Sequence, residues 1–544
     1  MTRNIGTYLV ELLVANDIDT VFGIPGVHNL ELYRGIAACS VKHVLTRHEQ
    51  GAGFAADGFA RLSNRIAACF VISGPGLTNV LTAAAQAYTD SVPLLVVAAS
   101  PVRASHGKQW GVLHELADQV GLAKGVFGVA RAAGSAQDVC DHLRQCLASL
   151  KVGRPRPAYL EIPLDLLGEP TELEAERFEL GALAPEASSA QIDAAVRLLS
   201  VAERPVVIAG GGARHAGAEL HRLVSALDAP LFTTTAGKGV LPESHPLNFG
   251  TSLPYKASLE VIADADVVLA VGTELAETDL FYAYKLPLGG LLVRIDIDQT
   301  KLADQYGADV RVWADAKCAL GALNQALDAR RATLASGGSS AHVRQGFATA
   351  RGGAHTFRAA LEKSFDEKSH AMNAALKAVR SALPWDAAVF TDMTQIAYFG
   401  NYAYPVEHPG QWFHPAGYGT LGYALPAALG AKVSTPARAV IALAGDFGLQ
   451  FTLNELMTAV EARLALPIVL WNNGALGQIR DDMLGAGIPP TGVVGENPDF
   501  PALAKAYGAH AVRVRDANAL TTALRTALDA GKPTLIEIIA ESFV

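Results

Sequence analysis

Two predicted strand ends near the C-terminus carry oxygen ligands of the kind that bind a hard cation. Two apolar runs predict buried strands, which end at the motifs Gly-Asp-Phe-Gly (445–448) and Asn-Asn-Gly-Ala (472–475). Amphipathic spacing predicts a helix over 452–463 between them. In one βαβ unit, both strands would present Asp446 and Asn473 toward the same crevice. Mg²⁺ accepts one carboxylate, one amide oxygen, one turn carbonyl and the oxygens of a bound phosphate. This stretch therefore predicts a magnesium and phosphate site. The alternative is a βαβ unit that merely has polar strand ends.

A second carboxylate, near the N-terminus, also follows a predicted strand. Residues 41–45 are predicted to form a short strand, and Glu49 lies in the motif Arg-His-Glu-Gln (47–50), ahead of a predicted small-residue helix over 51–61. Proteins of the α/β class bind ligands at such strand ends, so Glu49 is a candidate functional residue. Acidic residues also favour the first turn of a helix, so a solvated helix-start carboxylate is the alternative.

The elements that must position these groups alternate between strand and helix patterns along the chain. Three such segments of similar size predict an α/β protein with three doubly wound parallel-sheet domains, at 1–170, 185–330 and 371–544. The small polar stretch 335–340 predicts the start of an exposed linker. A glycine run at 210–212 resembles a phosphate-approach loop, but it does not match Gly-x-Gly-x-x-Gly.

Composition excludes several classes of function. The 544 residues suggest about three domains, and 50% hydrophobic with 18% charged residues fits a large α/β protein. With 53 Asp and Glu against 44 Lys and Arg, and with no basic stripe, we expect no nucleic-acid partner. We expect no membrane role, because polar residues or glycines interrupt every apolar run before ~18 residues and the N-terminus lacks a secretory signal. Five scattered cysteines predict a reducing, cytoplasmic location.

Several separated motifs, in a consistent order over nearly the whole chain, are more specific together than any one of them. They are Phe-Gly-Ile-Pro-Gly (22–26), Arg-His-Glu-Gln-Gly-Ala (47–52), Ser-Gly-Pro-Gly (73–76), Gly-Lys-Gly (237–239), Pro242, His-Pro (245–246), the 417–422 turn, Leu-Pro (425–426), Gly-Asp (445–446) and Asn-Asn (472–473). This set resembles the thiamine diphosphate enzymes of the acetolactate synthase and pyruvate decarboxylase superfamily. The resemblance implies a pyrimidine-binding, a central Rossmann-like and a diphosphate-binding domain, in that order.

The resemblance also implies roles for individual residues. Asp446 and Asn473 resemble the side-chain ligands of the Mg²⁺ ion that binds the diphosphate, with the carbonyl of Ala475 as a third ligand. A helix beginning near Gly448 would point backbone N–H groups at the diphosphate. The Gly419 carbonyl would orient the pyrimidine amino group. The residues expected to contact thiamine diphosphate are Gly26, Glu49, Gln395, Gly419, Leu421 (the apolar wedge under the V-shaped cofactor), Gly445, Asp446, Phe447, Gly448 and Asn473.

Glu49 resembles the glutamate that hydrogen-bonds the pyrimidine ring of the cofactor. In the family this carboxyl group stabilises the imino tautomer, which then removes the thiazolium C2 proton to make the ylid. Glu49 and Asp446 serve one cofactor from different subunits in that family. The resemblance therefore implies at least a homodimer, or a homotetramer.

Phe447 departs from the family pattern, in which the third residue of this motif is usually glycine. A residue other than glycine needs an ordinary backbone conformation and leaves less room beside the diphosphate. The cofactor assignment stands, with the detail of this turn open.

The enzymes of this superfamily differ in how they capture the enamine that remains after CO₂ loss. A decarboxylase protonates it and releases an aldehyde, whereas a synthase supplies a second 2-oxo acid. The motif Leu-His-Glu (113–115) lies where synthases usually have Phe-Gln-Glu and pyruvate decarboxylases have Leu-His-His. His114 is therefore a candidate proton donor, with a satisfied structural histidine as the alternative.

Two further positions concern the substrate tail. Asp482 stands where synthases carry a substrate-contacting tryptophan, and a carboxylate there or at Asp481 favours a cationic tail over an apolar one. A solvated surface pair is the alternative. The runs 23–35, which include His28, and 113–116 look most like 5-guanidino-2-oxopentanoate decarboxylases. We therefore expect His28, His114, Asp481 and Asp482 near the substrate.

We predict a thiamine diphosphate- and Mg²⁺-dependent 2-oxo acid decarboxylase, with 5-guanidino-2-oxopentanoate as the favoured substrate. An acetolactate synthase-like carboligase is the alternative enzyme. A non-catalytic cofactor-binding regulatory subunit, suggested by Phe447, is the alternative of another class, and the retained Glu49 argues against it. Residues 271–279 replace the arginine-containing pattern of flavin-binding synthases, so the sequence argues against bound FAD.

Overall fold

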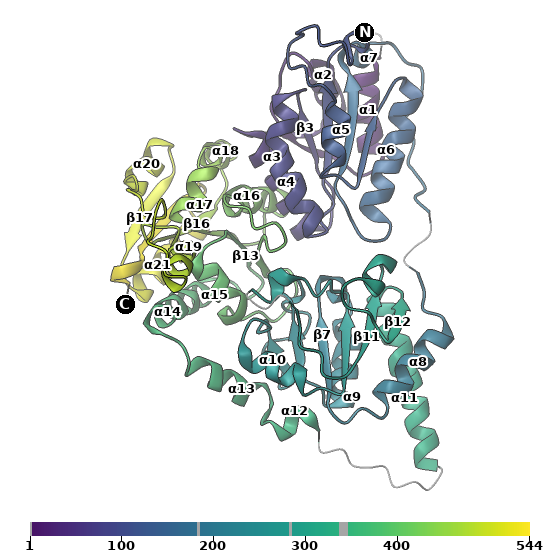
Figure 1. The fold of residues 1–544 in the computed structure, drawn as a ribbon. Coiled ribbons are helices and arrows are strands. Elements are labelled where there is room, and N and C mark those ends of the chain that lie inside the picture. The colour runs from purple at the N-terminus through teal and green to yellow at the C-terminus, as the bar shows by residue number, and fades with distance from the viewer. Residues whose placement is uncertain (1–2, 182–184, 282–284, 337–345, 544) are drawn as a thin grey trace. The chain divides into compact units, whose positions relative to one another are not determined.

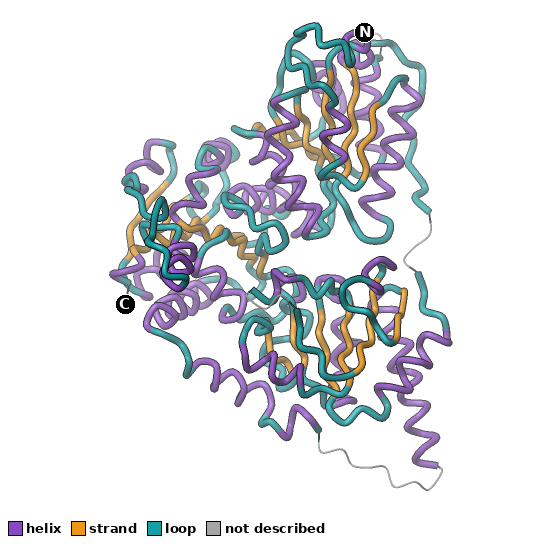
Figure 2. The backbone as a smooth tube through the Cα atoms, viewed as in Figure 1, coloured by secondary structure: helices purple, strands orange, loops and turns teal. Residues whose placement is uncertain are grey.

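The computed structural model describes residues 3–181, 185–281, 285–336 and 346–543, and it contains three six-stranded parallel sheets (Figure 1, Figure 2). One sheet lies within each of the three predicted segments. The predicted fold class is therefore confirmed, and the domain boundaries stay a prediction. Of the predicted linker over 335–340, residues 335 and 336 end helix α11 (Ala316–Ser336), and residues 337–340 lie outside the described residues.

The first sheet has the strand order β2-β1-β3-β4-β6-β5. Its strands are β1 (Thr20–Gly23), β2 (Lys42–Leu45), β3 (Ala68–Val71), β4 (Leu95–Ser100), β5 (Val129–Ala132) and β6 (Ala158–Pro163). Its helices are α1 (Ile5–Ala15), α2 (Leu30–Cys39), α3 (Glu49–Ser63), α4 (Pro75–Thr89), α5 (Gln119–Lys124), α6 (Ala136–Lys151) and α7 (Leu164–Leu167), with a short 3-10 turn at Arg103–Ser105.

Alternating side chains of β1 show how helices cover both faces of this sheet. Val21 belongs to an apolar cluster that also contains residues of α1, α2, α6 and α7. Its neighbour Phe22 points to the opposite face, because successive strand residues alternate, and its ring lies 6.2 Å from that of Phe59 on α3. The buried faces explain the continuous apolar runs in the sequence.

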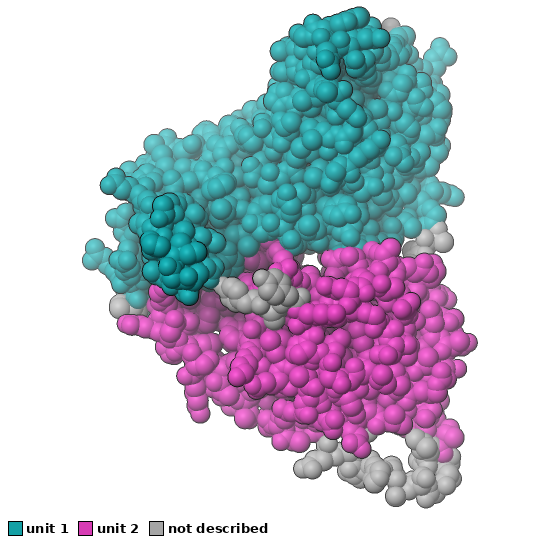
Figure 3. Space-filling model, in the orientation of Figure 1, with its two compact units in different colours: residues 1–182, 377–398, 417–544 teal, residues 183–376, 399–416 magenta. Residues whose placement is uncertain are grey.

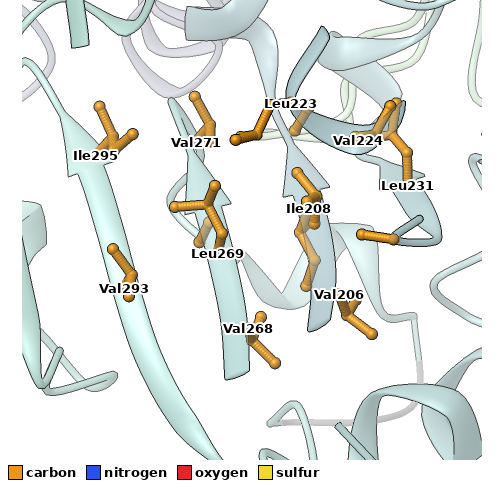
Figure 4. Close-up of a cluster of buried hydrophobic side chains, with 14 of the residues drawn as sticks. Val206, Ile208, Leu223, Val224, Leu231, Val268, Leu269, Val271, Val293 and Ile295 are labelled. Carbon is orange, nitrogen blue, oxygen red and sulfur yellow. The ribbon is translucent and has the colours of Figure 1, made fainter. Parts of the chain in front are cut away.

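The central sheet has the order β12-β11-β10-β7-β8-β9, which is the 3-2-1-4-5-6 order of Rossmann domains. Its strands are β7 (Pro205–Ala209), β8 (Leu231–Thr233), β9 (Asn248–Gly250), β10 (Val267–Val271), β11 (Leu291–Asp296) and β12 (Val310–Trp313). Helices α8 (Ser189–Leu199), α9 (Gly217–Leu227), α10 (Lys256–Ala263), α11, α12 (Phe347–Ala350) and α13 (Gly353–Glu362) complete this part of the chain. Figure 4 shows strand residues such as Ile208 and Leu269 packed with Leu223 of α9.

The glycine run at 210–212 is explained by chain packing. A Cβ atom on Gly210 would collide with the carbonyl oxygen of Gly272, and one on Gly212 would lie 2.9 Å from the Gly272 Cα. The turns after β7 and β10 therefore pack backbone against backbone, which only glycines allow.

The third sheet has the order β14-β13-β15-β16-β18-β17. Its strands are β13 (Ala388–Thr391), β14 (Trp412–Phe413), β15 (Val440–Gly445), β16 (Pro467–Asn472), β17 (His510–Val514) and β18 (Thr534–Ile539). Its helices are α14 (Glu367–Ala382), α15 (Gln395–Ala403), α16 (Ala424–Ser434), α17 (Asp446–Phe451), α18 (Glu455–Glu461), α19 (Gly477–Gly485), α20 (Phe500–Ala506) and α21 (Ala517–Leu528).

The chain forms two compact units (Figure 3). Residues 1–182, 377–398 and 417–544 form one, and residues 183–376 and 399–416 form the other. Within the first unit, α3 and α16 cross in close contact. A Cβ atom on Gly58 would collide with the carbonyl oxygen of Ala427, and one on Gly430 would collide with that of Ala55. Among the described residues, no helix is both long and apolar enough to cross a membrane.

Candidate active site

Glu49 lies at the first position of α3, immediately after the carboxyl end of β2. His48 caps this helix, because its imidazole accepts a hydrogen bond from the Gln50 N–H at 3.1 Å. Glu49 is 9% exposed as a residue, and its Oε2 accepts a hydrogen bond from Asn79 Nδ2 on α4 at 2.9 Å. The carboxyl group is thus held at the strand end by a polar partner from the next helix. It is not the solvated helix-start carboxylate that was the alternative interpretation.

Two of the predicted substrate residues, His28 and His114, lie side by side. Their ring centroids are 5.1 Å apart, with an angle of 71° between the rings. His28 Nδ1 is hydrogen-bonded to Ser73 Oγ, after β3. Burial, and next the electrostatic effect of the neighbouring His114, lower the pKa of His28 below its ordinary value. His114 Nδ1 is buried and has no hydrogen-bond partner among the described residues.

The segment that carries His114 packs tightly against the start of α4. A Cβ atom on Gly74 would lie 2.6 Å from the His114 carbonyl oxygen. The Gly74 N–H donates to Gln119 Oε1 at 2.9 Å, and the Gly111 N–H donates to Glu115 Oε2 at 2.8 Å. The backbone of His114 itself has a positive φ of 63°. A bulky residue in this conformation is uncommon, so packing must fix it.

Asp446 is the first residue of α17, directly after β15, so the helix begins two residues earlier than the predicted start near Gly448. Its side chain is almost fully buried, and Oδ2 accepts a hydrogen bond from Asn497 Nδ2 at 2.6 Å. Burial raises the pKa of Asp446, and the hydrogen bond from Asn497 opposes that shift. The same Asn497 Nδ2 donates to Asn472 Oδ1 at 2.9 Å, so Asn497 joins the two strand ends.

Asn473 is connected to two other predicted residues. Its Oδ1 accepts a hydrogen bond from the Ala475 N–H at 3.2 Å, and its Nδ2 donates to Gln395 Oε1 at 3.3 Å. Gln395 Nε2 in turn donates to Asp481 Oδ2 on α19 at 2.8 Å. The structure therefore brings Gln395, Asn473 and Asp481 together. Asp482 lies on an exposed part of α19, where its Oδ1 accepts a hydrogen bond from Gln478 Nε2 at 3.0 Å.

The predicted 417–422 turn connects β14 to α16. Gly419 has a φ of +69°, which favours glycine, and a Cβ atom there would lie 3.3 Å from Met393 Cε. Leu421 is half-buried in this turn. The N–H of Gly422 donates to both carboxylate oxygens of Asp392, at 3.0 and 3.1 Å.

Phe447 lies within α17 and has none of the positive φ angles found elsewhere in the described chain. The expected ordinary backbone conformation is therefore present. Its half-buried ring points toward Gly495, whose Cβ position would be 3.3 Å from Phe447 Cζ. The space taken by this side chain lies between α17 and the segment that also supplies Asn497.

The residues on the third sheet fit a magnesium diphosphate group by the chemistry of their donors. Asp446 offers one carboxylate, Asn473 an amide oxygen and Ala475 a carbonyl, at neighbouring strand ends. Within the described ranges, no group of three or more His, Cys, Asp or Glu side chains is placed to hold a metal ion. Mg²⁺ usually takes one or two carboxylates and completes its shell with phosphate and water oxygens, so the single carboxylate of Asp446 suits that ion.

Three side chains at the site were not assigned a role from the sequence. Asn79 bonds Glu49, Ser73 bonds His28, and Asn497 bonds Asp446. Ser73 is the first residue of the Ser-Gly-Pro-Gly motif and Asn79 follows that motif by three residues, so the motif offered a local signal for both. Asn497 follows a segment without helical or strand periodicity, so no local pattern pointed to it.

The chain matches three families of domains in sequence. Residues 3–122 match the thiamine pyrophosphate enzyme N-terminal TPP binding domain, residues 192–323 match the central domain, and residues 392–538 match the C-terminal TPP binding domain. Glu49 and the histidine pair lie in the first match, and Asp446 and Asn473 lie in the third.

Curated relatives align over nearly the whole chain. The probable 2-ketoarginine decarboxylase AruI of Pseudomonas aeruginosa is 47% identical over 549 residues, which cover 99% of this chain and 94% of that protein. The acetolactate synthase isozyme 3 large subunit of Escherichia coli is 30% identical, covering 96% and 91%. The acetolactate synthase large subunit of Lactococcus lactis is 29% identical, covering 96% and 90%. The chain therefore belongs to the thiamine pyrophosphate enzymes.

Proposed function

We propose that this protein is a thiamine diphosphate- and Mg²⁺-dependent decarboxylase of a 2-oxo acid, with 5-guanidino-2-oxopentanoate as its favoured substrate. The observation that carries the substrate is the 47% identity, over 99% of the chain, to a probable decarboxylase of 2-ketoarginine, another name for this acid. The synthases compared above are 29–30% identical. Loss of CO₂ and uptake of one proton would convert the substrate to 4-guanidinobutanal.

The third sheet would hold the cofactor by its diphosphate. Asp446, Asn473 and the Ala475 carbonyl would bind Mg²⁺, and the N–H groups at the start of α17 would face the phosphate oxygens. Asn497 would orient the Asp446 carboxylate through its 2.6 Å hydrogen bond. When bound, the cofactor supplies an electron sink for the carbanion that forms as CO₂ leaves.

Residues at the strand ends of the first sheet would carry out the proton transfers. Glu49, held by Asn79, would share a proton with the pyrimidine ring of the cofactor, and the Gly419 carbonyl with Leu421 would orient that ring. His114 would donate the proton that completes the aldehyde, because its Nδ1 is buried without a partner in the described chain. His28 would support it, held in place by Ser73.

The substrate tail would be recognised by a carboxylate near the diphosphate ligands. Asp481 fits this role better than Asp482, because Asp481 is half-buried and bonded to Gln395, whereas Asp482 lies on an exposed part of α19. A guanidinium group binds carboxylates through a planar fork of donors. We also propose that two copies of the chain pair, with Glu49 of one and Asp446 of the other serving one cofactor.

The test is CO₂ release from purified protein with thiamine diphosphate and Mg²⁺, on 2-oxo acids with guanidino, amino, aromatic and short aliphatic tails. We expect the guanidino acid to react fastest and to yield the aldehyde. Equal rates across the tails would remove the argument from Asp481. An acyloin or 2-hydroxy-2-methyl acid from pyruvate, with little aldehyde, would favour a carboligase. No CO₂ from any acid, despite bound cofactor, would refute both enzyme functions.

A further inference from the structure

The 417–422 turn, which lies outside the helices and strands, has backbone N–H groups bonded to side chains from elsewhere in the chain. At its first end, the Gly417 N–H donates to Asp90 Oδ1 at 2.8 Å. Asp90 is the C-cap residue that directly follows α4, in the first sheet's part of the chain. Thr420 donates to Gln86 Oε1 through both its N–H, at 3.4 Å, and its Oγ1, at 3.1 Å.

The second end of the turn is bonded to a carboxylate of the third sheet. Asp392 follows β13 and accepts hydrogen bonds from the N–H groups of Gly422, at 3.0 Å, and Ala424, at 3.4 Å. Thr452 Oγ1 donates to the Gly422 carbonyl at 2.7 Å. Asp90, from the first sheet's part of the chain, therefore holds one end of the turn, and Asp392, which follows β13 of the third sheet, holds the other end. Gly419 and Leu421 lie between these two ends.

A buried network supports Asp90 in this position. Arg61 Nη2 lies 2.7 Å from Asp90 Oδ2, and Arg61 Nε lies 2.7 Å from Asp57 Oδ1, both Arg61 and Asp57 belonging to α3. The side chains of Arg61, Asp57 and Asp90 are 12%, 0% and 10% exposed. Gln86 Nε2 also donates to Asp90 Oδ2, at 2.7 Å, so the two residues that contact the turn are bonded to each other.

Burying the charged side chains of Arg61, Asp57 and Asp90 costs free energy that packed apolar side chains in the same place would not cost. Well-packed apolar side chains can often replace a buried ion pair at no loss of stability, because burying charges carries a large desolvation penalty. A buried Arg61 with two carboxylates is therefore better explained by the directional bonds it maintains than by stability. Asp90 Oδ1 directs one such bond at Gly417, two residues before Gly419.

We propose that Asp90 and Gln86, supported by Arg61, and Asp392 on the opposite side are positioning residues that fix the Gly419 carbonyl and Leu421 for the pyrimidine of thiamine diphosphate. This inference rests on the proposed function, because it assumes that the turn contacts that ring. None of these four side chains needs to touch the cofactor. Their effect is to restrict the turn before the cofactor binds, so that less order must be imposed on binding.

The test compares Asp90→Ala with Asp304→Ala. Asp304 is a matched control, because its Oδ1 lies 2.6 Å from Nη1 of Arg294, a residue of β11 that is also buried and that belongs to the other compact unit. Both variants lose the carboxylate partner of a buried arginine, so both should lower the midpoint of thermal unfolding. In the cofactor-free protein, amide hydrogen exchange of a peptide covering 417–424 should speed up in Asp90→Ala only.

The second measurement uses protein loaded with thiamine diphosphate and Mg²⁺. We expect Asp90→Ala to slow hydrogen exchange at the thiazolium C2 of bound cofactor at least about tenfold, within the ~100-fold that a 1 Å misplacement can cost. Asp304→Ala should exchange at the wild-type rate. Asp90→Asn keeps an acceptor for the Gly417 N–H and should therefore recover part of the C2 exchange rate. If Asp90 served only to balance the charge of Arg61, Asp90→Asn would not recover that rate.

Thr420→Val tests the same idea if Asp90→Ala fails to fold, because it removes only the hydroxyl that donates to Gln86. It should slow C2 exchange in the same direction by a smaller factor. The positioning role would be overturned if Asp90→Ala and Thr420→Val both exchanged the C2 hydrogen at the wild-type rate and both kept wild-type amide protection at 417–424. That outcome would leave the proposed function intact. Wild-type protein that neither binds the cofactor nor exchanges its C2 hydrogen would overturn both.

Discussion

The first and third sheets share one strand order and carry different chemistry at equivalent strand ends. Counted within each sheet, both orders are 2-1-3-4-6-5. After its third strand, the first sheet has Gly74, against which the His114 segment packs, whereas the third sheet has Asp446 at the start of a helix. The fold thus supplies a similar strand-end site twice, and the proposed function assigns proton transfer to the residues of the first and anion and metal binding to those of the third.

The central sheet strengthens the contrast. It has the strand order of Rossmann domains, yet its glycine turn at 210–212 approaches the backbone of Gly272. Strand order therefore does not by itself assign ligand binding to a sheet. The predictions below test whether the two outer sheets divide the work as proposed.

Replacing Asp446 by alanine should have the largest effect on cofactor binding. It removes the one carboxylate among the proposed Mg²⁺ ligands, so we expect affinity for thiamine diphosphate in the presence of Mg²⁺ to fall at least about 100-fold, measured by calorimetry. Asn497→Ala removes only the hydrogen bond to that carboxylate and should weaken binding by about 10-fold to 100-fold. Unchanged affinity in Asp446→Ala would mean that the third sheet does not hold the metal.

Glu49→Gln should separate catalysis from binding. The substitution keeps the shape of the side chain and its contact with Asn79 but removes the acidic group, so cofactor affinity should change only a few-fold while turnover falls by about 10²–10⁴-fold. Titration of the cofactor and steady-state rates measure the two effects. If affinity and turnover fell together, as expected for Asp446→Ala, the division of work between the sheets would be refuted.

His114→Gln should change a later step. If His114 donates the proton that forms the aldehyde, CO₂ release in the first turnover should slow less than aldehyde release, in a rapid-quench experiment that quantifies both products. We expect a loss of about 10²-fold in aldehyde release. Ser73→Ala is a milder companion, because it frees His28 without removing either imidazole. An unchanged product profile in His114→Gln would remove this residue as the proton donor.

The smallest effect concerns Glu455, which connects the two sheets. Its carboxylate, on α18 of the third sheet, accepts a hydrogen bond from the Arg47 N–H at 3.0 Å, just before Glu49. Burial raises the pKa of Glu455 from 4.5 to about 7. The folded state therefore holds a proton that the unfolded state releases, and stability falls as pH rises from 4.5 to about 7, by roughly 3 kcal/mol.

Glu455→Gln should flatten that slope, because an amide does not titrate. Thermal unfolding midpoints between pH 5 and pH 8 measure the difference. Glu461→Gln is the control, since it makes the same change on the same helix at a side chain that is 54% exposed. The argument fails if Glu455→Gln keeps the slope of the wild-type protein.

Much of the local structure could be predicted from periodicity. The apolar runs 205–209, 267–271 and 291–296 coincide with β7, β10 and β11, whereas no strand was predicted at β5, β6, β9, β12, β14, β17 or β18. The predicted helix over 452–463 was wrong in its extent, because α17 ends at Phe451 and α18 covers only Glu455–Glu461. Apolar spacing continues across the break between them, so periodicity does not reveal it.

The sequence alone determined which groups are available and which elements carry them. Glu49 follows a strand, Asp446 follows another, and the spaced motifs indicated the cofactor, because residue type and local pattern are encoded within a few positions. Only the tertiary structure decided their partners. Gly417 meets Asp90 and Arg47 meets Glu455 across more than 300 residues of chain. Such pairs depend on how helices α3 and α16 pack, and no local spacing specifies that packing.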